Sequence, residues 1–293
     1  MKNELDRRRK YYLILDCETA TLPYAAKFTD SKTKQKVSIA KPLIYDLGWT
    51  VVDKKGNIYK KKSFLISEIF SVPAVFNTAY YAEKRPIYLE RLKGGAIDLV
   101  TWSAATAELV HDMELVEGVG AYNAMFDFKK AIPFTELYIN QLYSPNFNKW
   151  EKFQNSCCDE IASGSHYSSK EDFEPDIFRF RGKTYNLFDV WGLTCRHLIN
   201  NDDYKRACVA NGWKTESGKY FKTSAETTFR FCANNIDFEE EHTALSDAEI
   251  ESYLFSEAVK KNKGKIDFGI VFFPFRELGT VEVFQSKIGF GAF

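Results

Sequence analysis

A short apolar run near the start of the chain ends directly on two carboxylates. Tyr11 to Leu15 is followed by Asp16, Cys17 and Glu18, which is the pattern of a buried central strand with a polar site at its carboxyl end. Alternate residues of a strand point to the same face, so Asp16 and Glu18 are expected to project together. Such a pair repels unless a cation lies between the carboxylates. Alone, the triplet is more often a surface carboxylate pair than a site.

Two further strands are predicted after a polar loop. They cover residues 43–53 and 58–66 and are joined by a polar turn that contains Gly56. The later elements that we predict are a helix over 102–116, a strand at 118–122, a helix from about Ala124, a hairpin over 178–190 with Gly182 and Lys183 at its turn, and a helix over 244–260. A meander followed by alternating strands and helices predicts a mixed α/β sheet with helices on both faces.

We expect one decorated domain, because 293 residues are within the range of a single large α/β unit. Residues 1–10 are assigned to a basic N-terminal arm, 11–262 to the domain and 263–293 to a C-terminal extension. The domain contains extra stretches near 146–176 and 202–222 that we interpret as insertions. The extension has strand-like segments at 270–275 and 281–285, and it could pack on the domain or form a homo-oligomer contact.

The composition excludes several classes of protein. Forty basic residues balance forty acidic ones, so any binding to nucleic acid must be local rather than driven by net charge. Candidate phosphate contacts are the basic clusters Arg7 to Lys10, Lys54–Lys55 and Lys60 to Lys62, although such clusters are more often solvated surface. The six cysteines lack metal-binding spacing and are expected to be reduced thiols. No apolar run is long enough to span a membrane, so we expect a cytoplasmic protein.

Two later segments carry further candidate site residues. Asp127 follows Asn123 by four residues, about one turn into a helix that Asn123 is predicted to cap, where the helix dipole alone would favour an acid. His242 precedes Asp247 by five residues, a separation that turns two side chains to different sides of a regular helix. A shared site therefore requires His242 in the preceding loop and Asp247 in the first turns of the helix. Taken alone, each segment is explained at least as well by ordinary surface residues.

In this order, the segments LDCET (15–19), NAMFD (123–127) and HTALSD (242–247) resemble the three motifs of the DEDDh subgroup of the DnaQ-like 3′-to-5′ exonucleases. Their joint occurrence is far more specific than any one of them. The resemblance covers roughly residues 11–260 and implies a ribonuclease H-like fold. The two stretches interpreted as insertions, and the tail, depart from the family's minimal domain and leave partner and substrate choice open.

Carboxylates that converge in one cleft repel one another, and hard divalent cations that prefer oxygen ligands relieve this repulsion. We therefore expect two Mg²⁺ or Mn²⁺ ions. The expected ligands are Asp16, Glu18, Asp127 and Asp247, with Asp16 bridging the ions. The resemblance makes His242 the general base that activates water. The acidic run Glu239 to Glu241 is expected to raise the pKa of this histidine.

Four neighbouring residues are weaker candidates for substrate contacts. The resemblance places Thr19 and Leu22 where backbone and apolar groups meet the terminal nucleotide, although an ordinary loop explains them equally well. Asn123 is better explained as a helix cap than as a ligand. Phe126 is better explained as a core residue than as a base-stacking one.

The function that these observations favour is a metal-dependent 3′-to-5′ exonuclease acting on DNA, with single-stranded ends preferred. It would release nucleoside 5′-monophosphates, either alone or as a proofreading subunit with a polymerase or other replication partner. A 3′-to-5′ exoribonuclease is the first alternative, because the 2′-OH contact that separates the two is not legible in the sequence. The second alternative is a non-catalytic nucleic-acid-binding module on the same fold.

Overall fold

The computed structural model describes residues 5–6, 8–21, 27–29, 36–38, 42–143 and 174–287. Within this part of the chain, one mixed sheet has seven strands, which are in spatial order β6 (Asp98–Val100), β5 (Ile58–Ile66), β4 (Leu43–Val52), β1 (Tyr12–Ala20), β7 (Gly118–Ala121), β9 (Lys183–Asp189) and β8 (Ile177–Phe180). β1 and β5 both lie antiparallel to β4, whereas β7 runs parallel to β1 and β9 parallel to β7. The predicted meander and mixed sheet are confirmed. A separate small sheet pairs β2 (Lys27–Thr29) with β3 (Lys36–Ser38).

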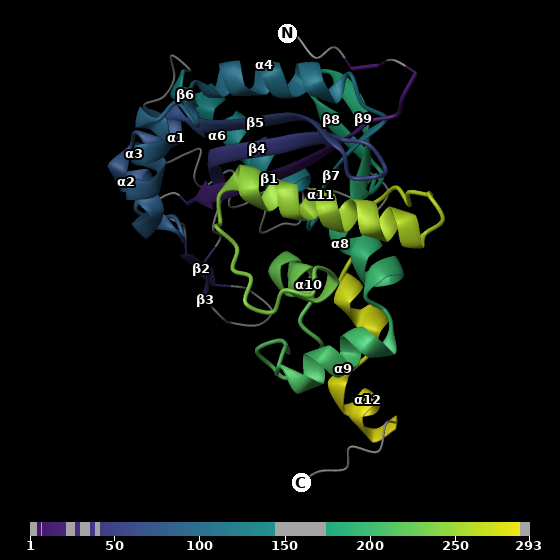
Figure 1. Ribbon diagram of the computed structural model, residues 1–293. Helices are drawn as coiled ribbons and strands as arrows, with labels where there is room; N and C mark the ends of the chain where they lie inside the picture. Colours follow the sequence, from purple (N-terminus) through teal and green to yellow (C-terminus); the bar gives the residue numbers. More distant parts are fainter. Residues whose placement is uncertain are drawn as a thin grey trace.

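Helices cover both faces of the large sheet, as the sequence predicts. One hydrophobic core includes residues of α1 (Ser67–Phe70), α2 (Pro73–Phe76), α3 (Arg85–Lys93), α4 (Trp102–Met113), α5 (Ala124–Phe126) and α6 (Ile132–Leu142). A second core includes residues of α8 (Val190–Leu193), α9 (Asp202–Ala210), α10 (Ala225–Cys232), α11 (Ala244–Lys261) and α12 (Val281–Lys287). Figure 1 shows α4 and α11 on opposite sides of the sheet, with α9, α10 and α12 beyond α11.

The alternation of side chains along β1 separates these two cores. Leu13 and Leu15 belong to the core on the α4 side, whereas Tyr12 and Ile14 belong to the core on the α11 side. Asp16 and Glu18 continue the row of Tyr12 and Ile14, because residues two apart on a strand share a face. The carboxylates of β1 therefore emerge under α11. Asp16 was expected at the tip of the strand, but β1 continues to Ala20, with a bulge in its pairing between Glu18 and Thr19.

The first turn of α11 packs unusually close to β4. A Cβ atom added to Gly48 would lie 2.3 Å from the backbone nitrogen of Leu245, so only glycine allows the helix to approach the strand this closely. Asp46, which is fully buried two residues earlier on β4, accepts a hydrogen bond from the Ala244 backbone N–H at 3.0 Å. A strand carboxylate thus satisfies one of the free N–H groups at the helix N-terminus.

Several local predictions are wrong at their turns and caps. The hairpin turn is Arg181–Gly182 rather than Gly182–Lys183, because both Arg181 (φ 48°) and Gly182 (φ 77°) are left-handed, as a two-residue hairpin turn of type I′ requires. The spacing of Thr223 and Glu226 predicts a capping box with Thr223 as the cap, but α10 is capped by Ser224, which accepts from Thr227 N–H. A proline at position 133 is expected to kink or end the helix that begins near Ala124. The α-helical pattern gives way to a π-helical turn at Asp127–Ala131 just before Pro133, but α6 then runs on to Leu142.

The C-terminal extension packs on the domain over its described part, up to Lys287. Leu278, Val281 and Phe284 belong to the second hydrophobic core. Neither strand-like segment forms a strand: Pro274–Leu278 is a 3-10 helix and Val281–Lys287 is α12. In the second segment the buried apolar side chains are Val281 and Phe284, and their separation of three residues is typical of a helix. An apolar run this short fits a strand and a helix equally well, which is why the sequence prediction was wrong.

Most of the first predicted insertion, residues 146–173, lies outside the described residues. The second contains α9. The segment GWKTESGKYFK (212–222) predicts a small hairpin after it, and a bridge between Lys214 and Phe221 confirms a hairpin-like turn there. In the part of the chain that the structure describes, no helix is long and apolar enough to cross a membrane. Four cysteines in that part (Cys17, Cys195, Cys208 and Cys232) are free thiols.

Replacing Gly48 by alanine is expected to destabilise the fold by about 3 kcal/mol or more, because the new methyl group meets helix backbone that cannot rotate away. The measurement is the free energy of unfolding in denaturant. Gly94→Ala is the matched control, since an added Cβ there makes ordinary contacts of 3.5 Å and should change stability by less than about 1 kcal/mol. Equal stability of the Gly48→Ala and Gly94→Ala proteins would contradict the close approach of α11.

Candidate active site

Carboxylates from two elements face each other where α11 lies against β1. Glu18 projects from β1, Asp247 lies in the first turn of α11, and His242 precedes that helix in the loop, as the sequence requires for a shared site. Each of these three side chains offers one possible ligand atom, and the three atoms all lie within 4.8 Å of one another. The structure therefore brings the first and third sequence motifs together.

Asp127 of the second motif lies in the π-helical turn after α5 and is buried. Its Oδ1 accepts a hydrogen bond from the Cys17 thiol at 3.0 Å. This bond places Asp127 beside the strand that carries Asp16 and Glu18, and repulsion from the Asp127 charge contributes to the raised pKa of Asp16. All five residues predicted to be catalytic thus converge on one region between β1, the Asp127 turn and the start of α11.

The carboxyl groups of this region all have raised pKa values. Burial is the largest cause at every one of them, and repulsion between neighbouring carboxylates adds to it. The pKa of Asp16 is well above its ordinary value, and that of Glu18 is raised to about 9. The pKa values of Asp127 and Asp247 are raised to about 7. The site therefore holds more negative charge at alkaline pH than its surroundings stabilise.

His242 is held in a specific orientation. Its backbone is left-handed, with φ 52°, and its imidazole stacks on the Tyr81 ring at 4.5 Å with an interplanar angle of 13°. Its Nδ1 lies 3.6 Å from Glu240 Oε2 and 3.9 Å from Asp247 Oδ2. The Lys84 ammonium lies 4.7 Å from the centre of the Tyr81 ring on which the imidazole stacks, close enough to act on the histidine.

The acidic run Glu239 to Glu241 was expected to raise the pKa of His242, and this prediction is wrong. Burial lowers the pKa of His242, and the positive charge of Lys84 lowers it further, while the negative charge of Glu226 acts in the opposite direction. The desolvation of the imidazolium outweighs the attraction of nearby carboxylates because Glu240 itself has its pKa raised to about 8 by burial and carries less charge. His242 is consequently neutral over most of the physiological pH range.

Two further buried carboxylates, Glu251 and Asp46, lie in this region, and the sequence alone did not indicate them. Glu251 lies one helical turn after Asp247, is 3% exposed and accepts a hydrogen bond from Tyr122 N–H at 3.0 Å; its i,i+4 spacing from Asp247 is the signal that could have identified it. Asp46 pairs with Glu18 in the β1–β4 register and accepts from the Tyr88 hydroxyl at 3.0 Å. Its position within the otherwise apolar strand β4 is a signal of the same kind.

The weaker substrate-contact candidates have mixed outcomes. Thr19 is partly buried directly after the β1 bulge, and Leu22 lies outside the described residues. Asn123 precedes α5 but is exposed and left-handed (φ 74°), and its side chain makes no capping hydrogen bond; the prediction that it caps the helix is wrong, because a left-handed residue cannot direct its side chain to the free N–H groups as an extended one does. Phe126 is partly buried against the core, as expected.

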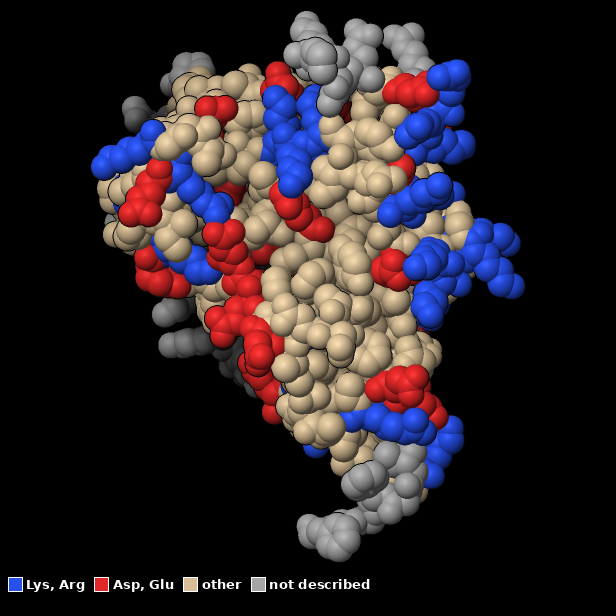
Figure 2. All heavy atoms as spheres, in the orientation of Figure 1, with Lys and Arg blue, Asp and Glu red and all other residues tan. Residues whose placement is uncertain are grey.

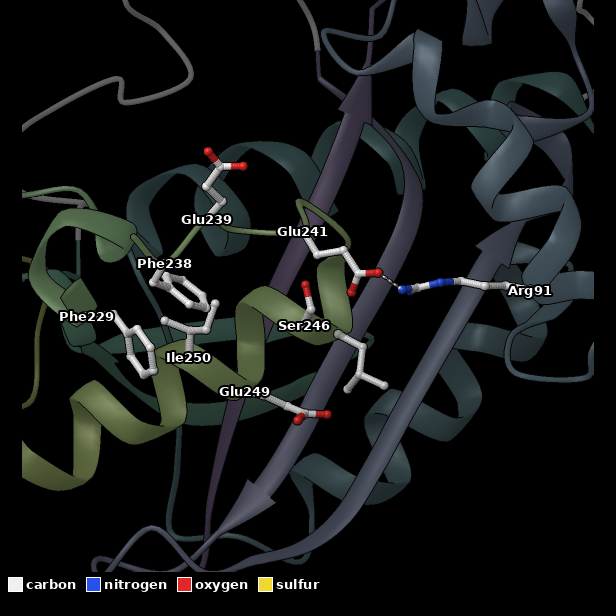
Figure 3. Close-up of a pocket in the computed structure, with 9 residues that line it drawn as sticks. Arg91, Phe229, Phe238, Glu239, Glu241, Ser246, Glu249 and Ile250 are labelled. Carbon is white, nitrogen blue, oxygen red and sulfur yellow. Dashed lines mark hydrogen bonds and ion pairs between the residues drawn. The ribbon is translucent and has the colours of Figure 1, made fainter. Parts of the chain in front are cut away.

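A hollow of about 510 Å³ lies beside the first two turns of α11. Figure 3 shows Phe229, Phe238 and Ile250 gathered at one end of it, while Glu241 reaches toward Arg91 at the other. Arg91 forms an ion pair with Glu241 and donates a hydrogen bond to the Thr243 hydroxyl at 3.1 Å. The rim of this hollow is acidic, so the hollow does not suit a phosphate. The contacts of Arg91 with Glu241 and Thr243 hold the loop that carries His242.

No protein-family model, curated protein or solved structure matches this chain.

The raised carboxyl pKa values predict how the stability of the metal-free protein depends on pH. A carboxyl group whose pKa is higher in the folded state than in the unfolded state stabilises the fold while it is protonated, and this contribution is lost as pH rises through the folded pKa. With folded values of about 7 for Asp127 and Asp247 and about 9 for Glu18, the free energy of unfolding measured in EDTA should fall between pH 6 and pH 9.

The variant Asp16→Asn should be more stable than the wild type in EDTA at pH 8, because it removes one of the repelling charges. Asp98→Asn is the matched control, since Asp98 is exposed on the edge strand β6 and its replacement should leave stability unchanged. Denaturant unfolding of the three proteins is the measurement. An Asp16→Asn protein that is less stable than the wild type at this pH would show that the carboxylates do not repel as described.

Proposed function

We propose that this protein is a metal-dependent 3′-to-5′ exonuclease on a ribonuclease H-like fold, which hydrolyses the terminal phosphodiester bond of a DNA strand and releases nucleoside 5′-monophosphates. The observation that carries the proposal is the convergence of Glu18, His242 and Asp247, with ligand atoms within 4.8 Å of one another, beside the partly buried Asp16 and the buried Asp127. The antiparallel meander followed by parallel strands supports the assignment of the fold.

The chemistry of the donor set suits divalent cations. The four residues predicted to be metal ligands are all carboxylates, and hard cations such as Mg²⁺ and Mn²⁺ prefer oxygen. Burial and mutual repulsion raise the pKa of each of these groups, so their ionised forms require a compensating positive charge. Asp16, Glu18, Asp127 and Asp247 would hold two ions, which when bound stabilise negative charge on the scissile phosphate and on the leaving oxygen.

His242 is suited to accept a proton from the attacking water. Its lowered pKa keeps the imidazole unprotonated near neutral pH, which is the form that a general base requires. Stacking on Tyr81 holds the ring in place. The water oxygen forms a bond to phosphorus as its proton passes to His242, and the bond from phosphorus to the 3′ oxygen of the preceding nucleotide breaks. The 3′ oxygen of the shortened strand leaves as an anion and takes a proton from solvent water, so that the strand ends in a 3′-hydroxyl.

The direct test is a time course on a 5′-labelled DNA oligonucleotide with Mg²⁺ or Mn²⁺. We expect a ladder of products that shortens from the 3′ end, and no hydrolysis in EDTA. A single internal cut, or a labelled mononucleotide as the first product, would contradict the proposed polarity. A matched RNA oligonucleotide in the same assay tests the choice of DNA, since the proposal requires the DNA strand to be degraded faster.

Replacing His242 should separate the base from the ligands. His242→Ala is expected to lower the single-turnover rate by about 10²- to 10⁴-fold, the usual range for a general base, with little change in substrate binding. At saturating metal, the wild-type rate should rise with pH through a titration that lies below the ordinary pKa of histidine, because burial and Lys84 lower the pKa of His242. That rise should be missing in His242→Ala.

His111→Ala is the matched control, because His111 is exposed on α4 and its removal should leave rate and pH profile unchanged. If the rise in rate persists with the same midpoint in His242→Ala, another group is the base. If His242→Ala instead loses metal binding, His242 is a metal ligand. Its Nδ1 lies 3.9 Å from Asp247 Oδ2, so both atoms could then bind the same ion.

A further inference from the structure

Basic side chains gather at the end of the molecule where α11 ends. Figure 2 shows Lys and Arg along the right-hand edge of the view, where the N-terminal segment, the β4–β5 turn and the end of α11 lie in Figure 1. We define the basic patch by Arg9, Lys10, Lys54, Lys55, Lys261 and Lys265. Since the whole chain has a formal net charge of zero, this local excess of cations is a specific feature rather than a reflection of composition.

Hydrogen bonds join the three segments of the basic patch. Lys54 Nζ donates to the Gly264 carbonyl at 2.6 Å and so ties the β4–β5 turn to the loop after α11. Arg9 donates to the Tyr59 hydroxyl at 2.8 Å and so ties the N-terminal segment to the start of β5. Between them lies a hollow of about 530 Å³ lined by Arg9, Lys10, Lys54 and Lys55, with Asp53 and Asn57. Four of the six cations are thus arranged around a concave surface.

The acids that contact the basic patch are fewer than its cations. Asp6 forms an exposed ion pair with Arg9 at 4.0 Å, and such a surface pair is weak. Asp53 is occupied within its own turn, where it accepts hydrogen bonds from Lys55 N–H, Asn57 and the Tyr59 hydroxyl. Lys10 forms an ion pair with Glu117 at 3.0 Å, but both side chains are about half exposed or more, and such a surface pair is weak. A phosphate can therefore replace Glu117 as the partner of Lys10 at little cost.

The chemistry of the basic patch selects phosphate groups rather than bases. Lys54 lies over the ring of Tyr12, at 5.9 Å from its centre, and Tyr11 packs edge-on against Tyr59. Tyr11 and Tyr12 are each only 3% exposed, so neither offers an open face for stacking a base. Contacts made here would be to the backbone of a strand and independent of its sequence.

The length of α11 relates the basic patch to the candidate active site. Asp247 and Lys261 are fourteen residues apart on this one helix, which corresponds to about 21 Å at 1.5 Å per residue. At about 3.4 Å per nucleotide of a stacked strand, this distance corresponds to roughly six nucleotides. We propose that the basic patch binds the phosphate backbone of the substrate strand roughly six nucleotides upstream of the 3′ end held at the active site. This inference rests on the proposed exonuclease function.

The test compares a patch variant, Lys55→Gln/Lys261→Gln/Lys265→Gln, with a control variant of equal charge, Lys93→Gln/Lys219→Gln/Lys287→Gln. All six lysines are exposed. Binding of a 12-nucleotide DNA is measured by fluorescence anisotropy in EDTA at several salt concentrations. The patch variant should bind more weakly than the wild type, and the slope of log affinity against log salt should fall by about two, at about 0.7 per lost single-strand contact. The control variant should match the wild type.

A second arm measures hydrolysis of 12- and 4-nucleotide DNA with Mg²⁺. The patch variant should have a lower kcat/KM than the wild type on the 12-mer and an unchanged kcat/KM on the 4-mer, which is too short to span from the site to the patch. Equal losses on both lengths, or equal 12-mer binding by patch and control variants in EDTA, would overturn the inference.

Phosphatidylserine vesicles serve as the competing polyanion. If the patch variant loses binding to vesicles but keeps its affinity for the 12-mer, the basic patch is a membrane surface and the inference is wrong. Absence of hydrolysis by the wild type on either length would instead count against the proposed function alone, because binding in EDTA does not require a functional active site.

Discussion

The packing of the first turn of α11 on β1 and β4 is the constraint on which the candidate site depends. Gly48 removes the side chain that would keep the helix away, and Asp46 binds the first backbone N–H of the helix. This contact brings Asp247 and Glu251 over the carboxylates of β1. Several carboxylates are therefore crowded into a buried region and repel one another. This packing is favourable only when protons or cations neutralise part of their charge.

The histidine and the carboxylates respond to the same burial in opposite directions. Desolvation disfavours the charged form of each, so it raises the pKa of Glu18 and Asp247 and lowers that of His242. A neutral imidazole beside these carboxylates is the arrangement that the proposed activation of water requires. The Tyr81 stack and the Arg91 contacts to Glu241 and Thr243 fix the loop on which this arrangement depends.

Much of the fold was predictable because its central strands and α11 have strong, unambiguous apolar patterns. The proximity of Glu18, His242 and Asp247 was predictable because their motifs each fall at the expected end of a strand or helix. Asp46 and Glu251 were missed, since their roles arise only from tertiary packing against α11 and Tyr122. The direction of the His242 pKa shift was wrong for a related reason: neighbouring acids are visible in the sequence, whereas burial and the approach of Lys84 are not. The tail segment at 281–285 was misassigned because short apolar runs fit either period.

The central claim is that the buried carboxylates exchange protons for divalent cations, and calorimetric titration of the protein with Mn²⁺ at pH 6.5 tests it most directly. Repeating the titration in buffers of different ionisation enthalpy gives the number of protons released on binding. Because the carboxyl pKa values are raised to about 7 at Asp127 and Asp247 and about 9 at Glu18, binding should release protons, and fewer should be released at pH 9. Metal binding without proton release at pH 6.5, or no binding at all, would contradict the account.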